Sequence, residues 1–403
     1  MKMKKIITIM IIALLAVSIT ACTSAEGLGS ITETLAETHT GTESSIESDL
    51  PLTYSTLSIE GSIIDASDLF TERDLEQTAD LSEAVYIEME SNFDISVENE
   101  GVYVITGIVE NTSIIVEVGD EEKVQLVFED VSITNEDSPA IYIKSGDKIF
   151  LNLTGSNVMM VTGAFEADGE TNLDAVIFSK SDIVLNGTGS LELVSSQGNG
   201  ITSKDDLKIT GGTYVIGASL DALEANDSIR IYDGDFTIIT YKDALHSENE
   251  EDNTLGYIYI AGGTFNIAAA DDAIRATTFV RIDSGTINIE TCSEGIEGTY
   301  VEINGGDITI YATDDGINAT AKSGYDVVIE VNGGAIEVSM ASGDTDGFDS
   351  NGSIYINGGT IDVTANSAFD ADRTAELNDG IVIVNGQQID QITVTAMGGV
   401  RKR

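Results

Sequence analysis

A repeat of about 22 residues constrains the fold of this chain more than any other feature. A short motif, in which an acidic residue precedes a small and then an apolar residue, recurs as "SLDALEAND", "KDALHS", "DDAIRA", "SEGIEG", "DDGINA" and "TDGFDS"; we call it the acidic step. The spacings between aligned positions are 22, 22, 29, 22, 21 and 31 residues, so one period is interrupted twice. Both insertions, "SENEEDNTLG" and "TAKSGYD", follow an acidic step, which predicts loops on one face of a repeat structure. We call the aligned positions the acidic ladder: Asn199, Asp221, Asp243, Asp272, Glu294, Asp315 and Asp346.

Each repeat also has the same internal order. Segments such as "LKITGGTYVI", "IYIAGGTFNI" and "IYINGGTIDV" alternate apolar and polar residues around a bend, as strands joined by tight turns do. The bend glycines, such as 211–212, 262–263 and 358–359, suit positive φ or close stacking. A unit this short cannot bury its own apolar side, but stacked units bury a continuous column. We therefore predict an all-β right-handed parallel β-helix, with three short strands per coil of about 22 residues, in a single elongated domain.

The domain boundaries follow from the extent of this pattern. Residues 57–173 are less regular, but "KVQLVFEDVSITN" has similar strand spacing. We predict that the β-helix covers residues 56–398 and that residues 56–110 include a cap that shields its open edge. A β-sandwich is the alternative fold, but it would show hairpin turns and no fixed register. The chain has two prolines, which agrees with central strands that need their N–H groups.

The N-terminus has the pattern of a lipoprotein leader. Three lysines among the first five residues precede an apolar run at 6–17 and the sequence "SITAC". This predicts a signal peptide at residues 1–21 and lipidation of Cys22. A plain signal peptide is the alternative. Residues 22–55, rich in Ser, Thr and Glu, predict a flexible tether. We expect an extracellular monomer anchored to the membrane by its lipid alone.

Charge and cysteine content narrow the partners. The formal net charge is −50, which argues against nucleic acid or an anionic lipid surface as the direct partner. Such acidity suits a solvated extracellular protein or one that binds divalent cations. With Cys22 lipidated, Cys292 has no partner for an intramolecular disulfide, so packing or ions must hold the fold.

The acidic ladder predicts a metal. In stacked coils, equivalent residues lie about 4.8 Å apart, and carboxylates at that spacing repel. Calcium would compensate this repulsion, because it accepts six to eight hard oxygens. A solvated turn that favours Asp is the alternative interpretation. The predicted calcium ligands are Asp221, Glu224, Asp243, Asp271, Asp272, Glu294, Glu297, Asp314, Asp315, Asp344, Asp346 and Asp349.

A second file of side chains precedes each glycine bend. Its members, which we call the strand strip, are Lys208, Arg230, Tyr259, Arg281, Glu302, Glu330 and Tyr355. Cations and tyrosines could hold glycan carboxylates and stack on sugar rings, although such residues also pack across strands with no ligand. We therefore predict carbohydrate contacts for Lys208, Arg230, Tyr259, Arg281 and Tyr355.

Longer segments resemble a known family. "ITSKDDLKITGG", "DALHSENEEDN" followed by "GYIYIAGGT", and the earlier "GVYVITG" and "KVQLVFEDVSITNEDSPAIYIKSGDKIFLNLTG" are similar to the carbohydrate-binding domain family of clostridial-type secreted lipoproteins. The resemblance covers roughly residues 85–385. It implies a β-helix like that of pectate lyases, calcium between coils, and affinity for cellulose or acidic sugars such as polygalacturonate, without established lyase activity.

Two departures refine this expectation. The family pattern D-G-[IL]-K-S reads here as Asp243-Ala-Leu-His246-Ser, so any glycan contact by that lysine is in doubt. The chain also lacks tryptophan, whereas flat cellulose-binding surfaces usually rely on aromatic platforms. The lack of tryptophan favours a polygalacturonate-like acidic polysaccharide held through calcium over cellulose.

Two other functions stay open. A calcium-dependent pectate lyase needs a Lys or Arg as general base, and Lys204, Lys242 and Arg275 are candidates near the ladder. Paired carboxylates occur as "DD", but the Gly-His-Gly and Arg-Ile-Lys triplets of β-helical hydrolases are missing. A structural or adhesive rod stiffened by calcium would need the same ladder. We favour a non-catalytic, calcium-dependent polysaccharide binder.

Overall fold

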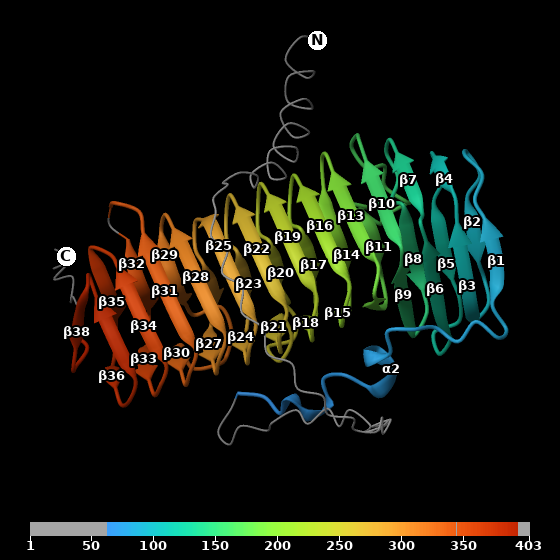
Figure 1. Cartoon of the computed structure of the whole chain (residues 1–403). Coiled ribbons are helices and arrows are strands. Elements are labelled where there is room, and N and C mark those ends of the chain that lie inside the picture. The colour runs from blue at the N-terminus through green and yellow to red at the C-terminus, as the bar shows by residue number, and fades with distance from the viewer. Residues whose placement is uncertain (1–62, 344, 394–403) are drawn as a thin grey trace, which may run out of the picture. The chain divides into compact units, whose positions relative to one another are not determined.

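The computed structural model describes residues 63–343 and 345–393. Within these ranges the chain is a right-handed parallel β-helix, as the repeat predicts, with very little helix. Successive coils contribute strands to three sheets, which we call sheets A, B and C (Figure 1). The predicted signal peptide, the lipidation site Cys22, the tether and the predicted ligand Asp344 lie outside the described residues.

Each complete coil passes from sheet B to sheet A and then to sheet C. Neighbouring strands pair in parallel except β37 and β38, which are antiparallel. Sheet A contains β1 (Val85–Glu88), β3 (Gly101–Thr106), β6 (Lys123–Glu129), β9 (Lys148–Thr154), β12 (Asp182–Gly187), β15 (Asp206–Ile209), β18 (Ser228–Ile231), β21 (Tyr257–Ile260), β24 (Phe279–Ile282), β27 (Tyr300–Ile303), β30 (Val328–Val331), β33 (Ser353–Ile356) and β36 (Ala375–Leu377). Sheet B contains β2 (Ile95–Val97), β5 (Ile114–Glu117), β8 (Ile141–Ser145), β11 (Ala175–Ser179), β14 (Asn199–Ser203), β17 (Leu223–Ala225), β20 (Leu245–Ser247), β23 (Ile274–Ala276), β26 (Ile296–Gly298), β29 (Asp315–Ala319), β32 (Asp346–Ser350) and β35 (Ser367–Ala371). Sheet C contains β4 (Ile108–Glu110), β7 (Ser132–Asn135), β10 (Ser156–Val161), β13 (Ser190–Ser195), β16 (Thr213–Ala218), β19 (Asp235–Thr240), β22 (Thr264–Ala269), β25 (Thr286–Cys292), β28 (Asp307–Ala312), β31 (Ala335–Met340), β34 (Thr360–Thr364), β37 (Ile381–Val384) and β38 (Gln387–Ile389).

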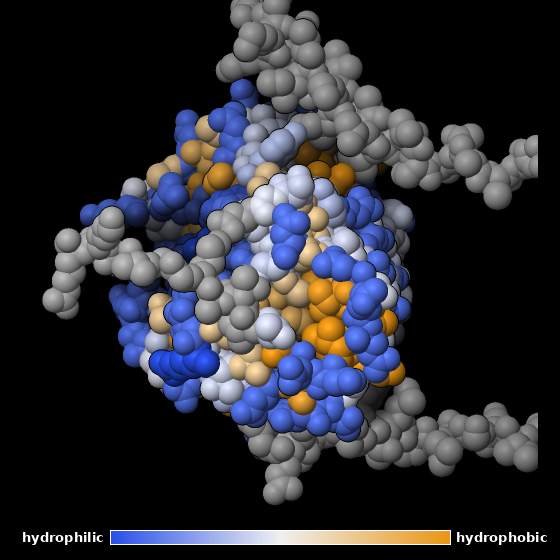
Figure 2. Space-filling model, turned by 90° about the vertical axis from the view of Figure 1, so that its left-hand side faces the viewer, coloured by the Kyte–Doolittle hydropathy of each residue, from blue (hydrophilic) through white to orange (hydrophobic). Residues whose placement is uncertain are grey.

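The interior is a continuous column of stacked apolar side chains. In sheet A, Leu207, Ile229 and Ile258 occupy the same position in successive strands, and all three are fully buried. Aromatic rings stack in the same way, with the centroids of Phe236 and Phe265 4.6 Å apart. Figure 2 looks onto the C-terminal end of the coils, where apolar side chains lie inside a rim of hydrophilic ones. Each coil therefore buries its apolar side against its neighbours.

The bends and insertions confirm how the repeat is built. In the pair at 262–263, the second glycine takes a positive φ of 102°, and a Cβ on Gly263 would lie 2.9 Å from the carbonyl oxygen of Gly234. The coils thus stack too closely at this corner for a side chain. The two insertions form the segments between β20 and β21 and between β29 and β30, both at the corner that joins sheet B to sheet A. The prediction of loops on one face is confirmed.

An N-terminal segment, residues 63–77, lies on the outer face of sheet A, and we call it the strap (Figure 1). It contains η1 (Ala66–Asp68) and α2 (Glu72–Leu75), and Thr71 and Asp74 form a capping box at the start of α2. The Asp74 carboxylate is fully buried, with Lys148 and Lys208 Nζ each 3.4 Å from one of its oxygens. The strap is therefore fixed by a buried charged cluster.

Further contacts extend along the strap. Arg281 Nη1 donates to the Ile64 carbonyl at 2.7 Å, and the Ile63 N–H donates to Glu302 Oε2 at 3.2 Å. At the other end, Gln77 Oε1 accepts the Gly187 N–H at 2.9 Å. The segment in which a cap was expected therefore begins with a strap across strands β27 to β12 and continues into the first strands, β1 to β4.

Among the described residues, no helix combines the length and apolarity that a membrane span requires.

Candidate functional site

The acidic ladder is a hydrogen-bonded column at the corner that enters sheet B. The backbone N–H of Asp221 donates to Asn199 Oδ1 at 2.9 Å, and that of Asp243 donates to Asp221 Oδ1 at 3.0 Å. The N–H groups of Asp272 and Glu294 donate in the same way to the preceding carboxylate, at 3.0 and 3.2 Å. One side-chain oxygen of each acceptor therefore holds the next coil, and in Asp221, Asp243 and Asp272 the second carboxylate oxygen remains for charged partners. This structural role accounts in part for the repeated acid.

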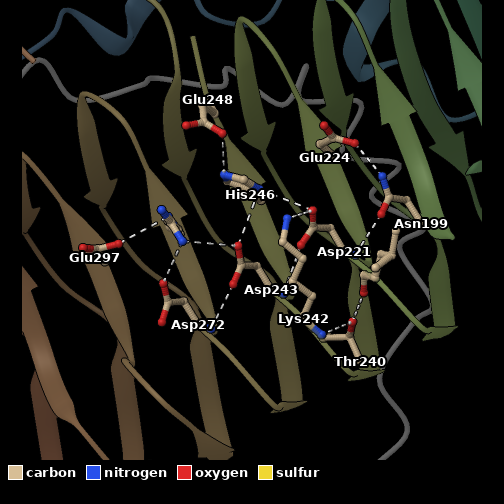
Figure 3. Close-up of polar contacts among 12 residues, drawn as sticks. Asn199, Asp221, Glu224, Thr240, Lys242, Asp243, His246, Glu248, Asp272 and Glu297 are labelled. Atoms are coloured by element: carbon tan, nitrogen blue, oxygen red, sulfur yellow. Dashed lines mark hydrogen bonds and ion pairs between the residues drawn. The ribbon is translucent and has the colours of Figure 1, made fainter. Parts of the chain in front are cut away.

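The Lys242 cation and the His246 imidazole both contact the early part of the ladder (Figure 3). Lys242 Nζ lies 2.7 Å from Asp221 Oδ2, and His246 Nδ1 lies 3.3 Å from the same oxygen. Burial opposes the charge of Asp221, but hydrogen bonds to His246 and Lys242 outweigh it and lower the pKa of this carboxyl. Glu224 accepts hydrogen bonds from Asn199 at 2.5 Å and Thr202 at 2.9 Å. The predicted ligands Asp221 and Glu224 thus already have protein partners.

In the middle of the ladder three carboxylates lie close together, and nearby cations compensate their negative charges only in part. Asp272, Glu294 and Glu297 each present an oxygen within 4.8 Å of the others, and Asp272 is 4% exposed. Burial, reinforced by the Glu294 and Asp243 charges, raises the pKa of Asp272 to about 8. Burial and the charge of Glu297 raise the pKa of Glu294 to about 7. Arg275 lies 3.6 Å from Asp272 and 3.4 Å from Glu297, and Lys322 Nζ contacts Glu297 Oε2, so two cations offset part of the repulsion.

Asn318 completes this cluster and was missed by the sequence reasoning. Its Nδ2 donates to Glu294 Oε2 at 3.0 Å, while its buried Oδ1 has no hydrogen-bond donor among the described residues. Asp243 Oδ2 also lacks a hydrogen-bond donor, but it has His246 Nδ1 at 3.5 Å and Arg275 Nη1 at 4.0 Å. Asp243, Asp271 and Asp272 come within 4.8 Å of one another. Buried acceptors without donors are uncommon and call for an explanation, such as an ion. The signal in the sequence was an Asn three residues after Asp315, at the position that Glu297 occupies after Glu294.

The last predicted ligands continue the same column. The Asp346 N–H donates to Asp315 Oδ1 at 3.1 Å. Burial, with the charge of Asp349, raises the pKa of Asp315 to about 7, and burial with the charge of Asp346 raises the pKa of Asp349 to about 6. Asp314 is exposed. The column of acids therefore stays electrostatically strained beyond Glu297.

Three lysines line up on the outer side of sheet B near the start of the acidic ladder. Lys144, Lys180 and Lys204 follow paired positions in β8, β11 and β14, and we call them the lysine file. Their amino groups approach the Asp168 carboxylate at 3.2 Å, Thr171 Oγ1 at 2.8 Å and the Glu224 carboxylate at 3.7 Å, respectively. The sequence reasoning singled out only Lys204. The missed signal is a lysine at the end of "YIK", "FSK" and "TSK" in three successive coils.

The strand strip is mostly covered, which corrects the expectation that it faces solvent. Lys208 is 5% exposed beneath Asp74, and Arg281 is fully buried beneath the strap. Tyr259 is 2% exposed and donates its hydroxyl to Asp283 at 2.8 Å. The reason is the strap, which the repeat pattern does not reveal.

The other two members of the predicted carbohydrate set differ in exposure. Arg230 is partly buried, and its guanidinium lies 2.8 Å from Asp206 Oδ2. Its Nη1 also donates to the Leu69 carbonyl of the strap at 3.5 Å. Tyr355 lies beyond the strap, is partly exposed and lines a pocket.

The candidate lyase bases are held as ion-pair partners. Burial lowers the pKa of Lys242, but its contact with Asp221 outweighs this and raises the pKa overall. The carboxylates of Glu297, Asp243 and Asp272 likewise outweigh burial and raise the pKa of Arg275. A general base needs the opposite shift. The geometry of these two residues favours charge compensation over proton abstraction.

A family model described as "Carbohydrate-binding domain-containing protein" matches residues 91–347. The chain belongs to this family. A curated carbohydrate-binding domain-containing protein of Acetivibrio thermocellus strain ATCC 27405 is 37% identical over 211 residues, which are 51% of this chain and 74% of the relative. A solved "polysaccharide lyase-like protein from C. thermocellum, Gadolinium derivative" is also similar, with 30% identity and a TM-score of 0.45 over 55% of this chain and 92% of that one.

Proposed function

We propose that this carbohydrate-binding domain holds an acidic, polygalacturonate-like polysaccharide through calcium on the outer side of sheet B. The observation that carries the proposal is the cluster of Asp272, Glu294, Glu297 and Asn318, with its converging oxygens and the buried amide oxygen without a donor. Family membership supports carbohydrate as the ligand. Calcium and the acidic substrate are the further steps that we propose.

The residues of the cluster fit calcium in their chemistry. They offer hard oxygen ligands from three carboxylates and one amide, and calcium takes six to eight such oxygens. When bound, the ion would supply positive charge, so that Asp272 and Glu294 would ionise at lower pH and a ligand carboxylate could approach. Positive charge is needed at this face because a chain of net charge −50 repels a polyanion.

The lysine file provides a second place for ligand carboxylates on the same sheet. Its three ammonium groups stack on consecutive coils, where like charges repel unless anions lie between them. Four coil steps separate β14, which precedes Lys204, from β26, which holds Glu297. At about 4.8 Å per coil these residues lie roughly 19 Å apart along the sheet. A polymer with a carboxylate on each sugar could contact both places at once.

Binding of polygalacturonate in calcium and in EGTA tests the proposal. We expect retention in calcium, loss in EGTA, about tenfold or more weaker binding for Glu297→Gln, and several-fold weaker binding for Lys180→Ala. Matched controls are Glu290→Gln, an exposed acid on β25, and Lys123→Ala, a lysine in an exposed ion pair. Both controls should bind as the wild type does.

Three outcomes would contradict the proposal. Binding that survives EGTA unchanged would remove calcium from it. If calcium raises the melting temperature but no glycan is retained, the domain is a stiffened rod. Release of unsaturated uronates, detected by ultraviolet absorbance, would make it a lyase. We also propose, from the leader pattern of residues 1–22, that the domain is displayed outside the cell on a lipid anchor.

A further inference from the structure

A pocket of about 540 Å³ opens on the outer face of sheet A, away from the ladder. Strands β27, β30, β33 and β36 supply side chains to its walls. It begins where the described strap ends, because Ile63 contacts Glu302 and the next members of the same file, Glu330 and Tyr355, line the pocket. Its volume lies in the usual range for small-ligand sites.

The polar groups of the pocket are held in place before any ligand arrives. The Tyr300 hydroxyl donates to Glu330 Oε2, and Asn357 Nδ2 donates to Glu330 Oε1 at 2.9 Å. Asn378 Nδ2 in turn donates to Asn357 Oδ1 at 2.8 Å. A carboxylate fixed from both sides cannot rotate freely, and orientation of this kind lowers the entropic cost of binding.

The rest of the pocket wall combines the aromatic ring of Tyr355 with the charged side chains of Glu376 and Arg373. Tyr355 pairs in register with Glu330 on one side and Glu376 on the other, and its ring is partly exposed. Arg373 is exposed and makes no ion pair within residues 63–343 and 345–393. The side chains at the pocket thus offer an apolar ring, hydrogen-bond acceptors and a planar donor.

This combination selects the chemistry of the occupant. Sugar hydroxyls both donate and accept hydrogen bonds, so they can meet Glu330, Glu376 and Arg373 together, while the apolar face of a sugar ring can lie on Tyr355. The pocket is lined by three carboxylates, those of Asp326, Glu330 and Glu376, and by one arginine, so its net negative charge would repel a uronate. We infer that this pocket binds a neutral, hydroxyl-rich saccharide unit. The inference does not depend on calcium or on the site proposed on sheet B.

Titration with neutral β-1,4-linked gluco-, xylo- and manno-hexasaccharides in EGTA, followed by calorimetry and ligand-observed NMR, tests this inference. We expect at least one of the three to bind without calcium. Tyr355→Ala and Arg373→Ala should each weaken that binding by about tenfold or more. Tyr86→Ala is the matched control, because Tyr86 is a 67% exposed tyrosine of the same sheet, and it should bind as the wild type does.

Glu297→Gln separates this inference from the proposed function. That variant should keep the neutral sugar and lose polygalacturonate. The inference is overturned if none of the three hexasaccharides binds, or if Tyr355→Ala and Arg373→Ala bind them as the wild type does. It is also overturned if polygalacturonate competes for the pocket in EGTA. Melting temperatures close to that of the wild type would show that these surface variants are folded.

Discussion

Substituting Asp272 by Asn separates the two roles of a ladder residue, which are to accept a hydrogen bond from the next coil and to carry a negative charge. The Oδ1 of Asp272 accepts the Glu294 N–H at 3.2 Å, and an amide oxygen can accept the same bond. The substitution therefore keeps the link between coils but removes an ionisable group that is 4% exposed. We expect Asp272→Asn to stabilise the metal-free protein near pH 8 and to abolish most of its stabilisation by calcium.

The magnitude follows from the raised pKa. The folded protein keeps the Asp272 proton up to about pH 8, whereas the unfolded chain releases it near 3.8. Because the folded state binds the extra proton across this window, the metal-free stability falls as the pH rises through it. At about 1.36 kcal/mol per pKa unit the largest cost near pH 8 is about 5 kcal/mol. Relaxation around Arg275 lowers this figure, and we expect about 2–4 kcal/mol.

Urea unfolding at about pH 5 and about pH 8, in EGTA and in millimolar calcium, checks this reasoning. In EGTA, the advantage of the variant should be small near pH 4, close to the unfolded pKa of 3.8, should already be measurable near pH 5, and should be largest near pH 8. In calcium near pH 8, the order should reverse, because only the wild type gains binding energy. Glu290→Gln, at an exposed position of β25, serves as the control and should change little. The reasoning is refuted if Asp272→Asn is less stable than the wild type in EGTA near pH 8, or if calcium stabilises both equally.

Two further substitutions test what holds the fold. Asp74→Ala leaves the buried Lys208 without its carboxylate partner, so we expect a loss of about 3–5 kcal/mol in urea unfolding, whereas Asp68→Ala, at an exposed position of the strap, should cost less than about 0.5 kcal/mol. Gly263→Ala forces a side chain into a positive-φ bend against a carbonyl oxygen, and should lower stability by about 1–3 kcal/mol. Gly324→Ala, where a Cβ meets nothing within 4 Å, is its control, and equal losses for the two glycine variants would contradict the close-stacking explanation.

Much of the fold could be predicted because its determinants are local and repeated. The alternation in "LKITGGTYVI" predicted β15 and β16 and the bend between them, and the period predicted that Leu207 and Ile229 would stack. The irregular coils before residue 173 were also predicted as strands. Alignment of the acids followed from the same register, and the bonds from Asp243 to Asp221 and from Asp272 to Asp243 confirm it. Calcium at these residues stays a prediction.

The details of the site were harder to predict. Asn318 stands at a position that the register defines, but its residue type does not match that of Glu297 in the neighbouring repeat. Lys180 matches Lys144 and Lys204 on its two sides, but the spacings of 36 and 24 residues depart from the period of about 22. The sequence also did not show which acids of the ladder are compensated by cationic side chains and which are not. Lys242 and His246 both reach Asp221, so one rung is neutralised by protein while Asp272 keeps a raised pKa. Such differences depend on which side chain extends toward which carboxylate, and spacing alone does not encode that.

The sequence by itself determined the coil, its three strands, the loop corner and the column of acids, because side-chain alternation and glycine bends act over a few residues and the period repeats them. Only the tertiary structure decided which columns of outward-facing side chains remain exposed to solvent. The strap covers Lys208 and Arg281 and leaves Tyr355 beside a pocket. Its contacts join residues 134 and 239 positions apart, such as Asp74 with Lys208 and Ile63 with Glu302. At those separations the partner is set by packing of the whole chain, which no local pattern records.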